Sequence, residues 1–118
     1  MQFLDLFPSD TETVAFTAGH AIFHENEAGG TMYVLLEGSV RLSLTGRTLE
    51  KIGPGAFFGE MSVVDGAPRS ATATALTDCR LIPVKPDRFR ALIAQSPDFA
   101  LEIMRVMARR LRSMDSRI

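Results

Sequence analysis

The stretch GAFFGEMSVVDGAPRSATATA, residues 55–75, could hold a small anion, because it combines closely spaced backbone and side-chain donors. Gly59 allows the backbone to approach a ligand closely. Residues 60–65 are long enough for a short helix whose first amides favour an anion, and Gly66 is placed to end it. Arg69 adds a planar set of donors that matches two phosphate oxygens. The stretch therefore predicts a site for a small sugar phosphate.

Glu60 has two roles open to it in such a site. As a hydrogen-bond acceptor it would bind a ribose hydroxyl beside the phosphate, since a carboxylate next to the phosphate itself would repel it. Alternatively, it is an acid in the first turn of a surface helix, where it stabilises the helix dipole and pairs with Arg69. The residue types alone leave both interpretations open. The hydroxyl of Ser70 and the amides of Ser70 and Ala71 would add donors to the phosphate.

The elements that must position this stretch are mostly strands. Short runs of branched and aromatic residues between Val14 and Val84, separated by turn residues at intervals of about ten, predict an antiparallel barrel or sandwich. The segment MYVLLEGSVRLSLTGRTLEKI predicts hairpin-like turns at Gly38 and Gly46. A further pair of strands is expected in RSATATALTDCRLIPV. The first of these would present small residues on a face that allows close approach, namely Ala71, Ala73 and Ala75.

After Val84 the apolar residues recur at helical spacing, which predicts two closing helices. Ser96 and Pro97 form a start signal for the second, which is expected to reach about Ser116. Most of its arginines lie near its C-terminal end, where cations stabilise the helix dipole. It also has a second apolar stripe, for which packing, a dimer seam and a lid over a pocket are the alternatives. The two stripes are Ile103, Met107 and Met114, and Leu101, Met104, Ala108 and Leu111.

The composition limits the classes of function. With 118 residues, the chain is expected to form a single domain over residues 1–118. A net charge of −1 and a pI near 6.1 disfavour an extended nucleic-acid surface. Cys79 is the only cysteine, so disulfides and thiolate metal sites are not expected. No apolar run approaches the ~20 residues of a membrane span, and we expect a cytoplasmic protein.

No catalytic or metal site is predicted. The sequence has no serine, cysteine or histidine constellation with an orienting acid, and no cluster of His and Asp for a metal pair. His20 and His24 have opposite strand parity if extended, so we interpret them as surface histidines rather than metal ligands. We therefore expect neither enzymatic activity nor a cofactor.

Residues 58–75, FGEMSVVDGAPRSATATA, resemble the phosphate-binding cassette of the cyclic nucleotide-binding domain family. GTMYVLLEGSVRLS resembles two strands of that family, and the C-terminal segment resembles the closing helices of its catabolite activator protein group. The resemblance implies a mostly β fold with α-helices: an eight-stranded antiparallel β-roll of the double-stranded β-helix or jelly-roll type. The roll would cover about residues 12–84 and contain a short cassette helix, and the two C-terminal helices would cover about 86–116.

The resemblance also implies a set of ligand-binding residues. Arg69 and Ser70 would bind the cyclic phosphate, and Glu60 the ribose 2′-hydroxyl. Further phosphate contacts would come from the amides of Gly59, Met61 and Ala71, and apolar contacts to base and sugar from Val40, Leu49 and Ile52. Family members with threonine at the position of Ser70 often favour the guanine nucleotide, so serine favours cyclic AMP over cyclic GMP.

Two departures from the regulators of that group qualify this expectation. Met114 and Asp115 stand where the regulators supply a pair of hydroxyls to the adenine, which leaves base selectivity open. The regulators also continue into a helix-turn-helix domain, whereas this sequence stops at Ile118, so direct DNA binding is not expected.

The leading hypothesis is therefore a regulatory module in which a cyclic nucleotide moves the last helix, and in which that helix forms a homodimer or oligomer. Two alternatives stay open: a degenerate roll used only for dimerisation or protein interaction, and a sensor of another small effector. The cassette pair Glu60 and Arg69 favours nucleotide binding over a degenerate roll, because an unused pocket has no need of both residues.

Overall fold

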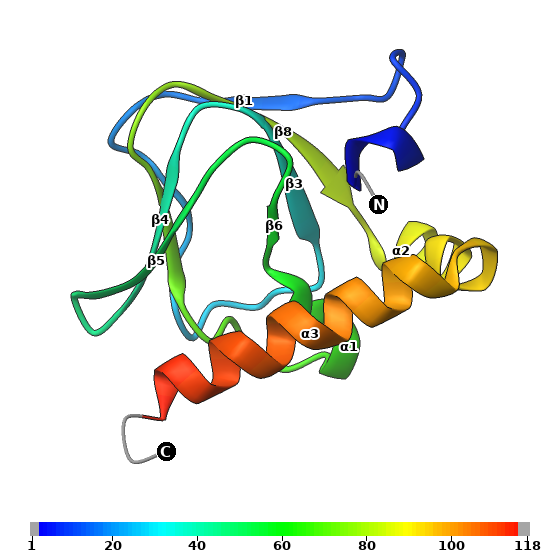
Figure 1. The fold of residues 1–118 in the computed structure, drawn as a ribbon. Coiled ribbons are helices and arrows are strands. Elements are labelled where there is room, and N and C mark those ends of the chain that lie inside the picture. Colours follow the sequence, from blue (N-terminus) through cyan, green and yellow to red (C-terminus); the bar gives the residue numbers. More distant parts are fainter. Residues whose placement is uncertain (1–2, 116–118) are drawn as a thin grey trace.

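The computed structural model describes residues 3–115, which form eight strands and four helical segments. In chain order these are η1 (Phe3–Leu6), β1 (Val14–Phe16), β2 (Ala21–Phe23), β3 (Met32–Glu37), β4 (Val40–Leu44), β5 (Arg47–Ile52), β6 (Phe57–Phe58), α1 (Glu60–Asp65), β7 (Thr72–Ala75), β8 (Cys79–Val84), α2 (Pro86–Gln95) and α3 (Pro97–Met114). Figure 1 shows a roll of strands with α3 running along one side of it.

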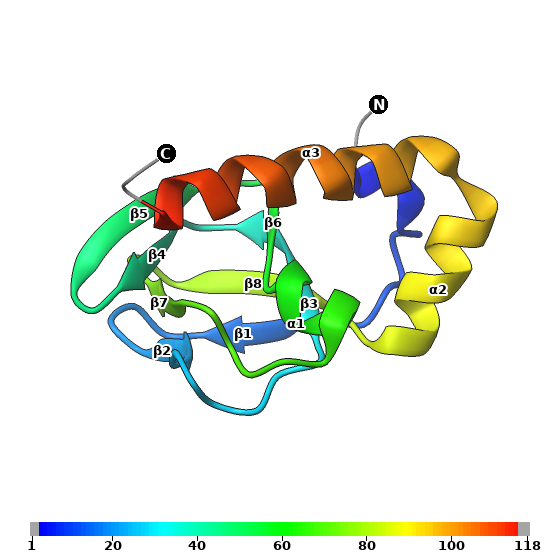
Figure 2. The ribbon, with the colours of Figure 1, turned by 90° about the horizontal axis from the view of Figure 1, so that it is seen from below.

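The strands form two four-stranded antiparallel sheets, with the order β1-β8-β3-β6 in one and β2-β7-β4-β5 in the other. Helix α1 lies between β6 and β7 in the chain and packs near α3, while α2 lies beyond the end of the roll (Figure 2). This arrangement confirms the predicted mostly β fold, an eight-stranded antiparallel roll with a short cassette helix and two closing helices.

Glycine turns join the strands in two different ways. At Gly46 the φ angle is 82° and β4 pairs directly with β5, so the hairpin predicted there is confirmed. Gly38 has a φ of 102°, but the strands on either side of it, β3 and β4, belong to different sheets. The hairpin predicted at Gly38 is therefore wrong, because alternation fixes the faces of a strand but not its partner. Likewise, β7 and β8 are not paired with each other.

Two apolar clusters stabilise the fold. One lies between the sheets and contains Leu35, Phe58 and Leu81, whereas the other joins the outer face of the first sheet to η1, α2 and α3. Ala73 and Ala75 are fully buried in the cluster between the sheets. These two alanines therefore allow the neighbouring strands to pack closely, and of the three predicted alanines only Ala71 is left to contact a ligand.

Helix α3 begins as predicted and presents one buried face. The Ser96 side chain accepts a hydrogen bond from the Phe99 amide at 3.2 Å, and Pro97 occupies the first helical position. The helix ends at Met114, and the predicted end at Ser116 lies outside the described residues. Its buried residues are Phe99, Ile103, Val106 and Arg110, and its exposed apolar residues are Leu101, Met104 and Leu111.

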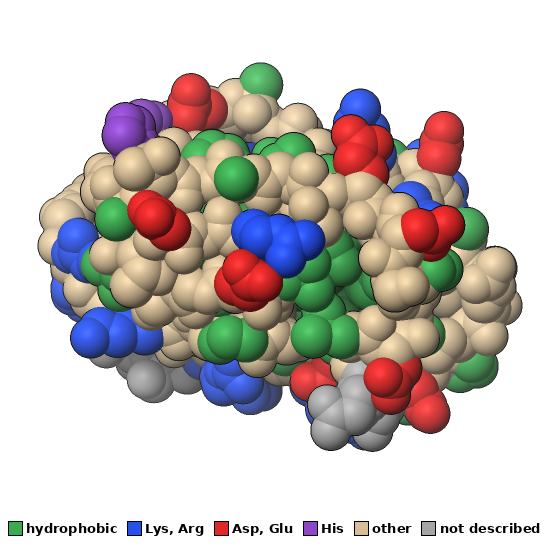
Figure 3. Space-filling model, turned by 90° about the horizontal axis from the view of Figure 1, so that it is seen from above, with side chains coloured by type: hydrophobic (Ala, Val, Ile, Leu, Met, Phe, Trp, Pro, Cys, Tyr) green, Lys and Arg blue, Asp and Glu red, His purple; other side chains and the backbone are tan. Residues whose placement is uncertain are grey.

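Within residues 3–115, no helix combines the length and apolar character that crossing a bilayer requires. On the face above β1 and β8, acidic and basic side chains are interspersed with apolar ones (Figure 3). There Arg80 pairs with Glu37, with 2.8 Å between Nη1 and Oε1. This face therefore carries no large field of one sign.

The corner at Gly38 provides a test of the roll topology. A Cβ at Gly38 would overlap the carbonyl oxygen of Asp78 and lie 2.8 Å from Cys79 Sγ, whereas a Cβ at Gly46 would meet nothing within 4 Å. Alanine at either position costs about 1 kcal/mol for a left-handed backbone. Because only Gly38→Ala also displaces the β7–β8 corner, we expect it to lower the free energy of unfolding by about 2 kcal/mol more than Gly46→Ala. Urea denaturation measures both, and equal losses would contradict the close corner.

Candidate functional site

The cassette folds around one short helix with a left-handed glycine at each end. Gly59 precedes α1 with a φ of 82°, and Gly66 follows it with a φ of 71° and donates its amide to the Ser62 carbonyl oxygen at 2.9 Å. The helix covers residues 60–65, as predicted. The chain then returns past the loop after β2, where the Arg69 amide donates to the Glu27 carbonyl oxygen at 2.8 Å. These bonds fix the arginine beside the beginning of α1.

Arg69 is a buried cation whose hydrogen bonds go to neutral groups. The residue is only 6% exposed, and Nη1 donates to Ser62 Oγ at 2.9 Å and to the Gly59 carbonyl oxygen at 3.2 Å. Its guanidinium carbon lies 4.0 Å from the centre of the Phe23 ring. The Nε atom is buried and has no hydrogen-bond partner. In the part of the chain that the structure describes, no carboxylate oxygen lies within 4.0 Å of Arg69.

Burial lowers the pKa of Arg69 from its ordinary value, although Tyr33, Glu27 and Glu60 act in the opposite direction. An arginine stays protonated at neutral pH even when its pKa falls, because its ordinary pKa lies far above neutral pH. The guanidinium is therefore charged, desolvated and incompletely hydrogen-bonded. An anion that reaches it would neutralise its charge and accept from its remaining donors.

Two glycines allow the backbone to close around this arginine. A Cβ at Gly59 would lie 2.9 Å from Arg69 Nη1 and 3.0 Å from the Thr31 carbonyl oxygen. A Cβ at Gly29, in the loop between β2 and β3, would overlap the Ser62 hydroxyl. The amide of the next residue, Gly30, donates to that hydroxyl at 2.9 Å. The close approach at Gly59 was predicted from the sequence, but the contacts of the loop between β2 and β3 with Ser62 were not.

Glu60 makes an ion pair with the last helix instead of with Arg69. Its side chain is 2% exposed, and its Oε1 accepts from Arg110 Nη1 at 2.6 Å. Arg110 Nη2 also donates to the Phe57 carbonyl oxygen at 2.7 Å. The alternative that Glu60 and Arg69 are surface partners is therefore wrong, since both side chains are buried and only Arg110 pairs with this carboxylate among the described residues.

Arg110 is a site residue that the sequence analysis did not single out. It was grouped with the arginines that stabilise the C-terminal end of the helix, but it is 5% exposed. A signal was present, because Arg110 follows Ile103 by seven residues and Val106 by four, which places it on the buried face of α3. A charged residue in an apolar stripe is expected to have a buried partner, and here that partner is the carboxylate of Glu60.

The cavity at the cassette brings together most of the predicted ligand-binding residues. Its lining includes Gly59, Glu60, Met61, Arg69, Ser70, Ala71 and Met114, together with Phe23, Leu42, Ser62 and Arg110. The cavity is narrow, with a volume of about 30 Å³. The Ser70 hydroxyl lies 3.3 Å from the Met61 sulfur.

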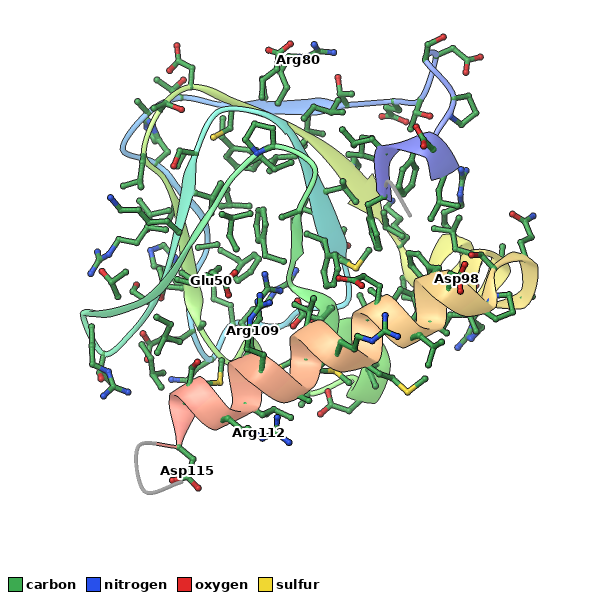
Figure 4. The ribbon with its side chains drawn as sticks, viewed as in Figure 1. Glu50, Arg80, Asp98, Arg109, Arg112 and Asp115 are labelled. Carbon is green, nitrogen blue, oxygen red and sulfur yellow. The ribbon has the colours of Figure 1, made fainter. Side chains whose placement is uncertain are left out.

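The predicted base-end residues are placed differently. Val40 and Ile52 are buried in the core cluster between the sheets, and Leu49 is partly buried on β5; none of the three lines the cavity. Leu42 takes the apolar position on β4 instead. Asp115 follows the end of α3, as Figure 4 shows. Contacts of these residues with a nucleotide base stay predictions.

Comparisons with known proteins identify the family of the chain. The cyclic nucleotide-binding domain family matches residues 13–96. The chain is 35% identical over 112 residues to the CRP-like cAMP-activated global transcriptional regulator of Mycobacterium tuberculosis, covering 91% of this chain and 50% of that protein. It is 43% identical over 91 residues to a cyclic nucleotide-gated potassium channel of Mesorhizobium japonicum, covering 77% of this chain and 25% of the channel.

A solved structure supports the same assignment. The catabolite activator protein of Thermus thermophilus superimposes with a TM-score of 0.77 at 37% identity, covering 88% of this chain and 51% of that one. The chain belongs to the cyclic nucleotide-binding domain family. It spans about half the length of the first curated relatives that it matches.

The buried pair makes a stability prediction. Replacing Arg110 with methionine leaves the Glu60 carboxylate buried without its cation, so we expect Arg110→Met to lower the free energy of unfolding by about 3–5 kcal/mol. Adding Glu60→Gln removes the uncompensated charge, so the double variant should lose less than the sum of the single losses. Urea denaturation of the four chains measures this coupling, and additive losses would contradict a direct buried pair.

Proposed function

We propose that the chain binds a 3′,5′-cyclic nucleotide, with cyclic AMP preferred over cyclic GMP, and acts as a regulatory module whose output passes through α3. The single observation that carries this proposal is the buried Arg69, whose Nε has no hydrogen-bond partner and which has no carboxylate within reach in residues 3–115. A buried charge of this kind is costly unless something neutralises it. A cyclic phosphate carries one negative charge and supplies acceptor oxygens, so it fits this requirement.

The ribose and base would lie between the cassette and the end of α3. Oε1 of Glu60 is engaged by Arg110, so Oε2 is the oxygen that would accept the ribose 2′-hydroxyl. Ser70 and the cassette amides would add donors to the phosphate. Met114 lines the cavity at the base end, where it would stack on the purine, and Asp115 would accept from an exocyclic amine. The adenine preference rests on Ser70 in place of threonine.

Ligand binding would act on α3 because that helix closes the cavity. Arg110 and Met114 both contribute to the lining. Small-molecule sites usually enclose ~300–1,000 Å³, far more than the narrow space present here. A nucleotide would therefore displace Met114 and shift the last turns of α3, while the Arg110–Glu60 pair holds the helix to the cassette. A ligand that changes these contacts shifts the position of the helix.

We further propose that α3 forms a homodimer. Leu101, Met104, Ala108 and Leu111 follow one another at alternating three- and four-residue intervals, the spacing of a two-helix seam. Met104 and Leu111 are 55% and 51% exposed, so the seam is not used by the fold itself. The proposed module has no catalytic role and needs no cofactor. The names of its relatives, which are receptors, regulators and gated channels, support a binding role.

Calorimetric titration with cyclic AMP, cyclic GMP and 5′-AMP tests the proposal. We expect the wild-type chain to bind cyclic AMP most tightly. Arg69→Gln should weaken that binding at least about a hundredfold, because it removes two charged hydrogen bonds to phosphate. Arg80→Gln is the matched control, since Arg80 lies on the side of the roll opposite α3 (Figure 4). This substitution should leave the affinity for cyclic AMP unchanged.

Thermal unfolding of each variant establishes that it is folded before titration. If Arg69→Gln does not fold, Arg69→Lys replaces it, because lysine keeps the charge but not the planar donor set. Absence of binding to either cyclic nucleotide by the folded wild-type chain would overturn the proposed function. Equal binding by wild type and a folded Arg69 variant would overturn the assignment of the phosphate site.

The dimer seam is tested by sedimentation. Introducing a charge at its centre by Met104→Glu should convert the dimer to a monomer, because like charges would face each other across the seam. Val64→Glu introduces the same charge at another exposed apolar residue, on α1, and should leave the dimer intact. A monomeric wild-type chain, with and without cyclic AMP, would contradict the homodimer.

A further inference from the structure

Arg110 is held by a second carboxylate, Glu50 on β5, which lies outside the cassette. Arg110 Nε donates to Glu50 Oε1 at 2.9 Å, and Nη2 lies 3.5 Å from Oε2. The neighbouring residue on α3, Arg109, donates from Nη2 to the same Oε2 at 3.1 Å. Figure 4 shows Glu50 and Arg109 close together between the roll and α3. Two successive arginines of the helix therefore converge on one strand carboxylate.

The donors of Arg110 are divided between two sides. Nε and Nη2 face Glu50 and the Phe57 carbonyl oxygen, and Nη1 faces Glu60. The guanidinium carbon lies 5.3 Å from the centre of the Phe57 ring. The Glu50 side chain is 26% exposed and that of Glu60 is 2% exposed. One edge of the guanidinium is thus fixed by the roll, and this sets the direction in which Nη1 points.

We propose that Glu50 is a positioning residue for recognition of the ribose 2′-hydroxyl, an inference that rests on the proposed function. Glu50 acts through Arg110 on Glu60 and does not touch the ligand. It holds the guanidinium so that Nη1 engages only Oε1 of Glu60, which leaves Oε2 oriented toward the hydroxyl.

The division of donors between two carboxylates acts in the same direction. With Glu50 present, one arginine serves two carboxylates, so only Nη1 is directed at Glu60. If Glu50 were neutral, only the Phe57 carbonyl oxygen would hold Arg110 to the roll. Arg110 would then be free to turn a second donor onto Glu60 and form the two-point pairing that arginine favours with a carboxylate. Both oxygens of Glu60 would then be engaged, and the ribose hydroxyl would lose its acceptor.

Comparing cyclic AMP with 2′-deoxy cyclic AMP isolates this effect, because the two ligands differ only in the hydroxyl that Glu60 would bind. We expect the wild-type chain to favour cyclic AMP by at least about tenfold, the value of one charged hydrogen bond. In Glu50→Gln the preference should fall to about threefold or less, because the hydrogen bond is largely lost. Affinity for the deoxy ligand should stay within about twofold of wild type, since the phosphate contacts are unchanged.

The control is Glu37→Gln, which removes the carboxylate from an exposed arginine pair with Arg80, remote from Arg110, and should leave the preference unchanged. If Glu50→Gln does not fold, Glu50→Asp replaces it, because its shorter side chain draws the carboxylate away from Arg110 and should lower the preference in the same way. If Glu50 had a purely structural role, Glu50→Gln would lower the affinities for both ligands equally, and that result would overturn the inference. An unchanged preference for cyclic AMP over the deoxy ligand in a folded variant would also overturn it. Absence of cyclic AMP binding by wild type would overturn the proposed function and this inference together.

Discussion

The buried ion pair between Glu60 and Arg110 is the interaction on which the rest of the site depends. It joins the first residue of the cassette helix to the last helix across 50 residues of sequence. Two charges in a region this buried are stable only when each has its partner, so the position of α3 and the orientation of Glu60 are set together. The pair therefore joins the cassette directly to α3.

Arg69 is the complementary case, a buried charge without a carboxylate partner among the described residues. Its backbone is fixed by the loop after β2, and its side chain is confined by Phe23, Ser62 and the glycines at 29 and 59. The fold therefore constrains the guanidinium on several sides and leaves Nε without an acceptor. Preorganised donors of this kind bind an anion with little further ordering. The two buried arginines thus differ in role, since Arg110 holds α3 to the cassette and Arg69 is available to a ligand.

The strands, the closing helices and the short helix of the cassette could be predicted because their signals are local. Period-two runs, helical spacing after Val84 and the cap at Ser96 each depend on a few neighbouring residues, and all are present in the structure. Strand partners could not be predicted in the same way, so the sequence predicts a hairpin at Gly38 although this turn joins two sheets. The pairing of Arg110 with Glu60 and Glu50 was missed for a related reason. A pattern on one helix indicates that a charge is buried but does not identify the strand that meets it.

The most direct test of this account is a crystal structure of the chain grown with cyclic AMP. The account predicts the cyclic phosphate within hydrogen-bond distance of Arg69 Nε, the ribose 2′-hydroxyl on Glu60, and Arg110 still paired with that carboxylate. It would be contradicted by a nucleotide bound elsewhere on the roll, or by one bound at the cassette without contact to Arg69.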